Sequence, residues 1–148
     1  MKAKRSGFTL VEILIVVVIL GILAAIVIPQ FTEASTEAKL SSLCTDLQTL
    51  RSQIELYKIQ HNDVPPTFAG FVAQMTAQTD ITGAAGTDYG PYVQKIATNQ
   101  FNNDDTLNAS GTIGDNGGGW EYDATTGQIN ADDDYDNVLP AGPDHAAL

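Results

Sequence analysis

Residues 4–31 read KRSGFTLVEILIVVVILGILAAIVIPQF, and this stretch decides the fold. Basic residues open it, and from Ile13 to Pro29 nearly every residue is apolar. An apolar run of about 20 residues is long enough to cross the hydrocarbon core of a membrane as a helix. Basic residues that flank such a helix stay in the cytoplasm, so we expect the rest of the chain on the far side of the membrane.

Glu12 stands at the start of the apolar run. A charged side chain inside a membrane helix costs roughly 2.5–3.5 kcal/mol, so it usually has a partner or a role. No Lys or Arg lies within helical reach of Glu12 in the apolar run. A cut between Gly7 and Phe8 would create a positive amine one helical turn before Glu12, on the same chain or a neighbouring one. The alternative is an acid that is tolerated near the membrane interface.

The quoted stretch resembles the N-terminus of type IV pilins and of type II secretion pseudopilins. The resemblance rests on the basic leader, Gly7, Phe8, Glu12 and the apolar helix with Pro29. It implies that a prepilin peptidase cleaves after Gly7 and that the new Phe8 amine is methylated. It also implies that Glu12 pairs with this amine on an adjacent subunit, and that the helix around Pro29 loosens in the filament.

The helical period continues beyond the apolar run. Apolar residues at spacings of three and four form one stripe on a polar helix: Leu40, Leu43, Leu47, Leu50, Ile54 and Tyr57. The stripe predicts a helix that buries one face against a globular body, with a short coiled-coil seam as the alternative. The helix should end near His61, because Pro65 and Pro66 follow. From Phe8 to His61 it would be roughly 80 Å long, with a kink or local melting at Pro29.

The rest of the chain predicts a small globular unit. Thr67 is expected to cap a short helix with apolar residues at helical spacing: Phe68, Phe71, Val72 and Met75. Residues 90–96 indicate a turn that enters a strand, and residues 99–119 indicate a long polar loop. Residues 119–130 predict a hairpin that packs Trp120 and Tyr122 on the apolar stripe. The predicted fold class is α+β and pilin-like, with a long N-terminal helix, transmembrane and then amphipathic, on a small antiparallel sheet.

These patterns divide the chain into four segments. We expect a leader peptide at 1–7, the transmembrane and filament-core half of the helix at 8–31, its amphipathic half at 32–63, and a globular domain with an acidic tail at 64–148. The formal net charge of −11 gives a surface that repels phosphate backbones, so no nucleic acid is expected to bind the isolated subunit. Cys44 is the only cysteine, which excludes a disulfide within the chain.

Two features bear on the choice within the pilin superfamily. GPYVQKI at 90–96 and GWEYDATTGQI at 119–129 resemble the C-terminal half of the major pseudopilins of type II secretion. Residues 98–101 read Thr-Asn-Gln-Phe, where that group commonly has Asp-Pro-Trp-Gly. Adhesive type IV pilins usually close this region with a disulfide, which one cysteine cannot form. The comparison favours a pseudopilin, and a surface pilus for adhesion, motility or DNA uptake is the alternative.

Alternating acids near the C-terminus make a candidate metal site: Asp132, Asp134 and Asp136. They match the first positions of an EF-hand loop, but position six is Asn137 rather than Gly and position twelve is Pro143 rather than Glu. Major pseudopilins hold calcium in a C-terminal loop, so the resemblance implies calcium at a site of another kind. A solvated acidic tail is the alternative.

The sequence points to no enzyme. His61 and His145 are not in HExxH spacing, and the chain has neither a nucleophile elbow nor a P-loop. We expect a filament subunit of a periplasmic pseudopilus for type II protein secretion, anchored by one span in a bacterial inner membrane with its C-terminal domain in the periplasm. The expected partners are copies of the same chain, the prepilin peptidase, the inner-membrane assembly platform and minor pilins or pseudopilins. A secreted binding domain behind an ordinary signal peptide is the alternative from another class.

Overall fold

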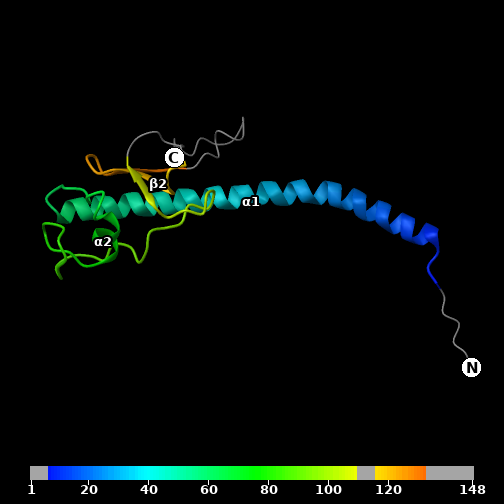
Figure 1. Ribbon diagram of the computed structural model, residues 1–148, viewed down its shortest axis with the longest axis horizontal. Coiled ribbons are helices and arrows are strands. Elements are labelled where there is room, and N and C mark those ends of the chain that lie inside the picture. The colour runs from blue at the N-terminus through cyan, green and yellow to red at the C-terminus, as the bar shows by residue number, and fades with distance from the viewer. Residues whose placement is uncertain (1–6, 110–115, 133–148) are drawn as a thin grey trace, which may run out of the picture. The chain divides into compact units, whose positions relative to one another are not determined.

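The computed structural model describes residues 7–109 and 116–132 (Figure 1). The elements follow in the order α1 (Leu10–Gln60), α2 (Phe71–Thr76), β1 (Leu107–Ala109), β2 (Trp120–Asp123) and β3 (Gln128–Ala131). The chain forms two compact units, Met1–Ala38 and Lys39–Leu148, and α1 contributes residues to both. The class is α+β, as the sequence predicts.

The first unit is built on the N-terminal part of α1. Its large apolar side chains from Phe8 to Phe31 are all exposed, by between 41 and 84 %. Among the described residues, α1 is the one helix long and apolar enough to cross a membrane. A helix that is apolar on every side needs an apolar environment around it, and a membrane or a bundle of like helices supplies one.

Pro29 lies inside α1. It has no N–H, so it cannot donate the hydrogen bond that the carbonyl four residues earlier would otherwise receive. The helix continues through Pro29 as predicted, and it does not melt locally there in the subunit. The loosening of this turn in a filament stays a prediction.

The second unit forms around the C-terminal part of α1. The buried face of this part consists of Leu43, Leu47, Leu50, Ile54 and Tyr57, so the predicted stripe is confirmed, with Leu40 only half-buried at its edge. The helix ends at Gln60, and the chain leaves it through Asn62 and Asp63, which have φ of 55° and 65°. Asn and Asp are the non-glycine residues that adopt this left-handed conformation most readily. The predicted end near His61 is therefore correct.

Three strands form one sheet in the order β1-β2-β3. Strands β2 and β3 make the predicted antiparallel hairpin, with Trp120 opposite Ala131 and Asp123 opposite Gln128. Strand β1 pairs with β2 in parallel, with Leu107 opposite Trp120. The sheet is therefore mixed rather than wholly antiparallel, and β1 lies inside the stretch predicted as a loop.

The short helix differs in detail from its prediction. Helix α2 begins at Phe71, and the Thr67 hydroxyl accepts the N–H of Gly70 in the turn before it rather than capping the helix itself. Phe71 and Met75 are buried, whereas Phe68 and Val72 are exposed by 40 and 52 %. A helix of six residues has room for one buried turn, so only half of the predicted apolar face reaches the core.

Residues 90–96 do not form the predicted strand. The Gly90–Pro91 peptide bond is cis, and the N–H groups of Tyr92 and Val93 both donate to the carbonyl of Met75, at 2.9 and 3.0 Å. The segment is thus held by the last turn of α2 and not by a neighbouring strand.

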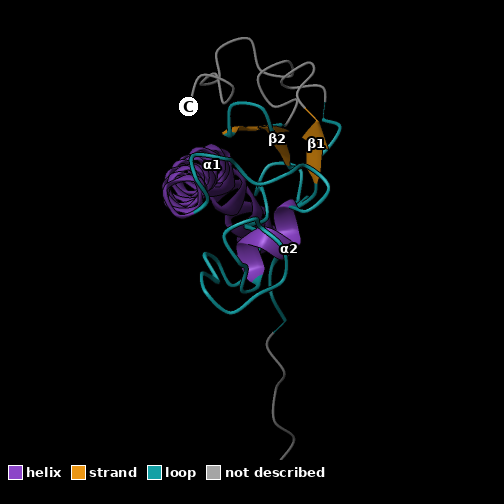
Figure 2. Cartoon of the chain, turned by 90° about the vertical axis from the view of Figure 1, so that its left-hand side faces the viewer, coloured by secondary structure: helices purple, strands orange, loops and turns teal. Residues whose placement is uncertain are grey.

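The core of the second unit lies between α1, α2 and the hairpin, and Figure 2 shows the strands and α2 on the same side of α1. Trp120 and Tyr122 are buried in it together with the stripe of α1, as predicted. Their polar atoms are satisfied, because Trp120 Nε1 donates to the Ala97 carbonyl and the Tyr122 hydroxyl donates to the Pro66 carbonyl, both at 2.7 Å. Two loops without regular structure are therefore tied to the sheet by aromatic side chains.

Candidate processing and assembly site

The segment before α1 contains the residues predicted from the sequence as the cleavage and methylation site. Gly7, Phe8 and Thr9 are exposed and not helical, and α1 begins directly after them. A Cβ added at Gly7 would meet nothing within 4 Å. The subunit itself therefore has no need of glycine at this position.

Glu12 and Thr9 form a reciprocal capping box at the start of α1. The Thr9 N–H and hydroxyl donate to Glu12 Oε2 at 2.8 and 2.7 Å, and the Glu12 N–H donates to Thr9 Oγ1 at 3.3 Å. A capping box satisfies donors that the first helical turn leaves without partners. Sequence reasoning missed this contact, although the Thr-x-x-Glu spacing before an apolar run is its ordinary signal.

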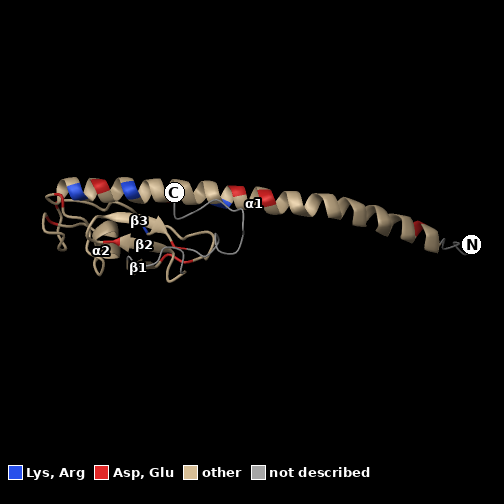
Figure 3. Cartoon of the chain, turned by 90° about the horizontal axis from the view of Figure 1, so that it is seen from above, with Lys and Arg blue, Asp and Glu red and all other residues tan. Residues whose placement is uncertain are grey.

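The capping box gives the Glu12 carboxylate neutral donors and no cation. Within the described ranges 7–109 and 116–132, the one ion pair is between Lys58 and Glu55. Beyond Glu12, α1 carries no charged residue before Glu33, and Figure 3 shows this uncharged stretch in tan. A positive partner for Glu12 therefore has to come from outside the described contacts of one subunit.

Gly21 lies in the middle of the apolar stretch. A Cβ added there would meet nothing within 4 Å, so no contact inside the subunit requires a glycine. Glycine in a helix interior costs about 1 kcal/mol relative to alanine. A close approach by a second helix is one arrangement in which a missing side chain is an advantage.

The candidate metal ligands are only partly described. Asp132 is fully buried and accepts hydrogen bonds from the N–H groups of Asn116 and Gly118 and from the Asn108 amide. Asp134 and Asp136 lie outside the described residues. No group of three or more His, Cys, Asp or Glu in the described part of the chain could hold a metal ion. A calcium site stays a prediction, and the described surroundings of Asp132 are those of a hydrogen-bonded carboxylate.

Two further polar side chains, His61 and Asn108, make contacts inside the second unit. His61 is buried and stacks on Tyr57 with ring centroids 3.7 Å apart, while its ring nitrogens contact the Tyr57 carbonyl and the Thr79 hydroxyl. Asn108 begins an Asn-Ala-Ser triplet at 108–110 that fits a glycosylation sequon. It is half-buried in β1, and its amide nitrogen donates to Asp132 Oδ2. The sequon asparagine therefore uses this nitrogen inside the fold.

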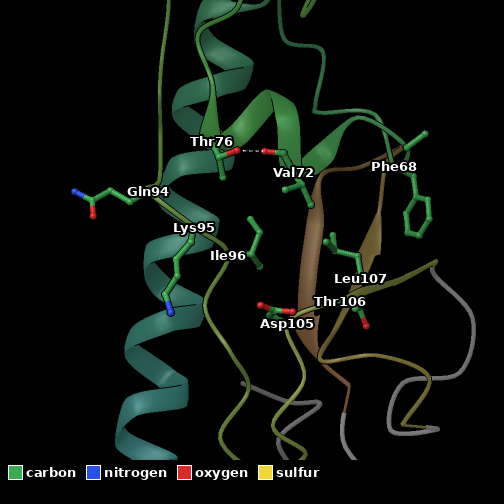
Figure 4. A pocket seen from close by; sticks show the side chains of 10 residues that line it. Phe68, Val72, Thr76, Gln94, Lys95, Ile96, Asp105, Thr106 and Leu107 are labelled. Carbon is green, nitrogen blue, oxygen red and sulfur yellow. Dashed lines mark hydrogen bonds between the residues drawn. The ribbon is translucent and has the colours of Figure 1, made fainter.

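A surface pocket of about 610 Å³ lies between α2 and β1 (Figure 4). Its walls are mainly apolar, with Phe68, Val72, Ile96 and Leu107 on the lining and Lys95 at one side. The Thr76 hydroxyl donates to the Val72 carbonyl within the same helix. The described lining pairs no nucleophile with a base, so the pocket does not suggest a reaction.

Known proteins resemble this chain both in its N-terminal segment and over most of its length. Residues 2–28 match the family model of the prokaryotic N-terminal methylation motif. Proteins named type II secretion system core protein G are similar over most of the chain. The one from Pseudomonas aeruginosa is 33 % identical over 76 % of this chain and 80 % of its own length. The one from Escherichia coli is 28 % identical over 90 and 91 %, and the one from Vibrio cholerae 33 % over 68 % of both. No solved structure matches this chain.

Proposed function

Because this chain belongs to the family of type II secretion system core protein G, we propose that it is a major pseudopilin, a structural filament subunit and not an enzyme. The observation that carries the proposal is the apolar helix of the first unit, whose large side chains between Phe8 and Phe31 are 41–84 % exposed. Leaving so much apolar surface in water is strongly unfavourable, since each fully exposed aliphatic side chain costs about 1.5–3 kcal/mol. A membrane before assembly and neighbouring subunits after it both cover this surface.

Processing begins with hydrolysis of the Gly7–Phe8 peptide bond. Water adds across this bond, the leader leaves with a Gly7 carboxylate, and Phe8 acquires a free amine. The bond is accessible, because residues 7–9 are exposed and lie outside the helix. Since the subunit does not require glycine at position 7, we attribute this glycine to the peptidase, whose cleft admits a residue without a side chain. Methylation of the new amine leaves it basic and therefore still positive at neutral pH.

Assembly uses Glu12 and the new amine. The carboxylate has neutral hydrogen-bond donors within its own subunit, so the Phe8 amine of an adjacent subunit is its natural counterion. Charge-assisted hydrogen bonds are roughly twice as strong as neutral ones, and in an apolar surrounding they are also directional. Pairing of one Glu12 with one amine would therefore set the axial register of the subunits. Packing of residues 8–31 against neighbouring subunits would supply the buried apolar surface that holds the filament together.

The same features support the proposed location, and the family supports the proposed partners. The basic leader keeps the N-terminus in the cytoplasm, so the second unit lies in the periplasm when α1 crosses the inner membrane once. A filament that grows from this position needs the prepilin peptidase, an inner-membrane assembly platform and minor pseudopilins, besides further copies of this chain. The assembled pseudopilus would extend and retract in the periplasm and so move proteins outward.

Deleting the chain in its native organism tests the proposal. We expect proteins that are normally released to the medium to accumulate in the periplasm, and a plasmid copy to restore their release. Surface filaments and the behaviours that depend on them should stay unchanged. Normal secretion combined with lost surface filaments would contradict the proposal and indicate a type IV pilus subunit.

A further inference from the structure

Oxygen atoms from separate parts of the second unit converge on one asparagine. Asn102 Nδ2 lies 2.8 Å from Asn116 Oδ1 and 2.7 Å from the carbonyl oxygen of Gly118. The same nitrogen lies 2.9 Å from the carbonyl oxygen of Asp132, which directly follows β3. Residues 102, 116–118 and 132 are distant in sequence, so one side chain joins three segments.

The orientation of the Asn102 amide is fixed by its other end. Asn102 Oδ1 accepts the N–H of Asp104 at 3.1 Å, which leaves the nitrogen facing the three oxygens. An amide nitrogen carries two hydrogens, so three acceptors share them. Oxygens gathered from separate segments are the surroundings that a calcium ion usually has. Here the hydrogens of a neutral amide, with their partial positive charge, occupy the centre.

The carboxylate of Asp132 lies in the complementary arrangement. Its side chain is fully buried. Asp132 Oδ1 accepts the N–H of Asn116 at 3.3 Å, and Oδ2 accepts the N–H of Gly118 at 3.1 Å and the Asn108 amide at 3.3 Å. Such donors compensate the cost of burying a carboxylate, because each directs a positive hydrogen at it.

These donors do not fit a calcium site. Calcium takes six to eight oxygen ligands at 2.3–2.6 Å. The hydrogens of Asn108, Asn116 and Gly118 already occupy three of the about four lone-pair sites of the Asp132 carboxylate, which leaves little capacity for binding an ion. The described residues around Asp132 therefore supply hydrogen-bond donors where a calcium site needs oxygen atoms.

We propose that Asn102 and Asp132 form a metal-independent lock, the Asn102–Asp132 lock, that holds Asn102 and residues 116–118 to the end of β3. The resemblance to major pseudopilins implies calcium in a C-terminal loop, and in this chain the lock replaces that requirement. The second unit therefore folds to its full stability without a divalent cation. The lock needs neither Asp134 nor Asp136, which lie outside the described residues.

Thermal unfolding of the full chain in detergent tests the proposal. Trp120 is the only tryptophan and is fully buried in the second unit, so its fluorescence reports the unfolding of that unit. We expect the same midpoint in EDTA and in millimolar Ca²⁺. If the chain had a calcium site, Ca²⁺ at a hundred times the dissociation constant of that site would raise the midpoint on the order of 10 °C. A rise of that kind would overturn the proposal.

Two substitutions locate the effect. Asn102→Asp places a carboxylate among three oxygens, and Asp132→Asn removes the charge that the donors surround. We expect each to lower the midpoint by roughly 5 °C or more, equally in EDTA and in Ca²⁺. The matched controls are Asn103→Asp and Asp88→Asn, which make the same chemical changes at exposed positions and should leave the midpoint unchanged. A variant that equals its control, or wild-type stability that needs Ca²⁺, contradicts the lock.

Discussion

At the scale of single residues, Glu12 has one set of partners in the subunit and a second, proposed partner in the filament. In one subunit its carboxylate accepts the N–H and hydroxyl of Thr9, so the first turn of α1 is capped. In a filament the proposed partner is a positive amine. The capping contacts explain how an isolated subunit tolerates a carboxylate at the start of an apolar helix.

Glu12→Gln separates the two stages. Glutamine keeps an oxygen for Thr9 and loses the charge, so we expect normal amounts of processed protein in the membrane. Loss of a charge-assisted bond worth about 1.5–3 kcal/mol should reduce assembled filaments by ten- to a hundredfold, measured by electron microscopy and sedimentation. Glu33→Gln, an exposed position on the same helix, is the matched control and should assemble normally. Full assembly of Glu12→Gln would refute the charge pairing.

Tyr122 gives the second unit a sensitivity to alkaline pH. Burial raises the pKa of its phenol well above the ordinary value of about 10, and the nearby Tyr57 and Asp123 add to this. The folded chain therefore holds the proton more tightly than the unfolded chain does. The stabilisation is complete below about pH 10 and is lost as the pH rises above it.

Tyr122→Phe tests this dependence. The variant loses the hydrogen bond to the Pro66 carbonyl, so we expect a loss of about 1 kcal/mol at neutral pH. Above pH 10 its unfolding free energy should fall less steeply than that of the wild type, by up to about 1.4 kcal/mol per pH unit. Urea unfolding at several pH values measures both effects. Equal slopes in the two proteins would contradict the role given to Tyr122.

At the scale of elements, α1 protects the outer strand of the sheet. Arg51 extends from α1, and its Nε and Nη2 both donate to the Ile129 carbonyl of β3, at 3.1 and 3.0 Å. Nη2 also donates to Asn130 Oδ1 at 3.0 Å. A strand at the edge of a sheet exposes carbonyls that could pair with another chain, and the guanidinium covers one of them here.

Arg51→Met should show how much this contact contributes. Methionine keeps the apolar stem and removes the donors, so we expect the second unit to lose about 1.5–3 kcal/mol of unfolding free energy. Glu55→Gln is the control, because it breaks an exposed ion pair with Lys58 that is worth less than about 1 kcal/mol. Denaturant unfolding followed by Trp120 fluorescence compares them. A loss for Arg51→Met no larger than that of the control would refute the edge contact.

Elements whose apolar residues recur at a regular spacing were predictable from the sequence. Elements that form only through tertiary contacts were not. The stripe from Leu43 to Tyr57 and the hairpin around Gly127 repeat apolar residues at the spacing of their structure, so the sequence carries them. Strand β1 has three residues and forms because β2 lies beside it. No local sequence pattern predicts this pairing. The cluster around Asp132 has the same cause, since its donors come from residues 108, 116 and 118.

At the scale of the whole molecule, the two compact units have different requirements. The first presents apolar side chains on every side of its helix, and the second buries its own core. The first therefore needs a membrane or other subunits, whereas the second does not. This division suits a subunit that is stored in a membrane and packed in a filament through one part while the other stays folded.

Removing residues 1–31 should leave the second unit intact. We expect the fragment 32–148 to be monomeric and soluble without detergent, with a buried Trp120 and one cooperative unfolding transition. Size-exclusion chromatography and fluorescence-monitored unfolding test this. Aggregation of the fragment, or an exposed tryptophan, would mean that the apolar helix is required for the fold of the second unit.

The central claim, that this chain is a processed filament subunit, is tested most directly at its N-terminus. Mass spectrometry of the N-terminal peptide, taken from protein in its native membrane, identifies the first residue and any modification of its amine. The account predicts a peptide that begins at Phe8 and carries one methyl group on that amine. A peptide that begins beyond Pro29 would mean that an ordinary signal sequence had been removed together with the apolar helix, and would contradict the filament function.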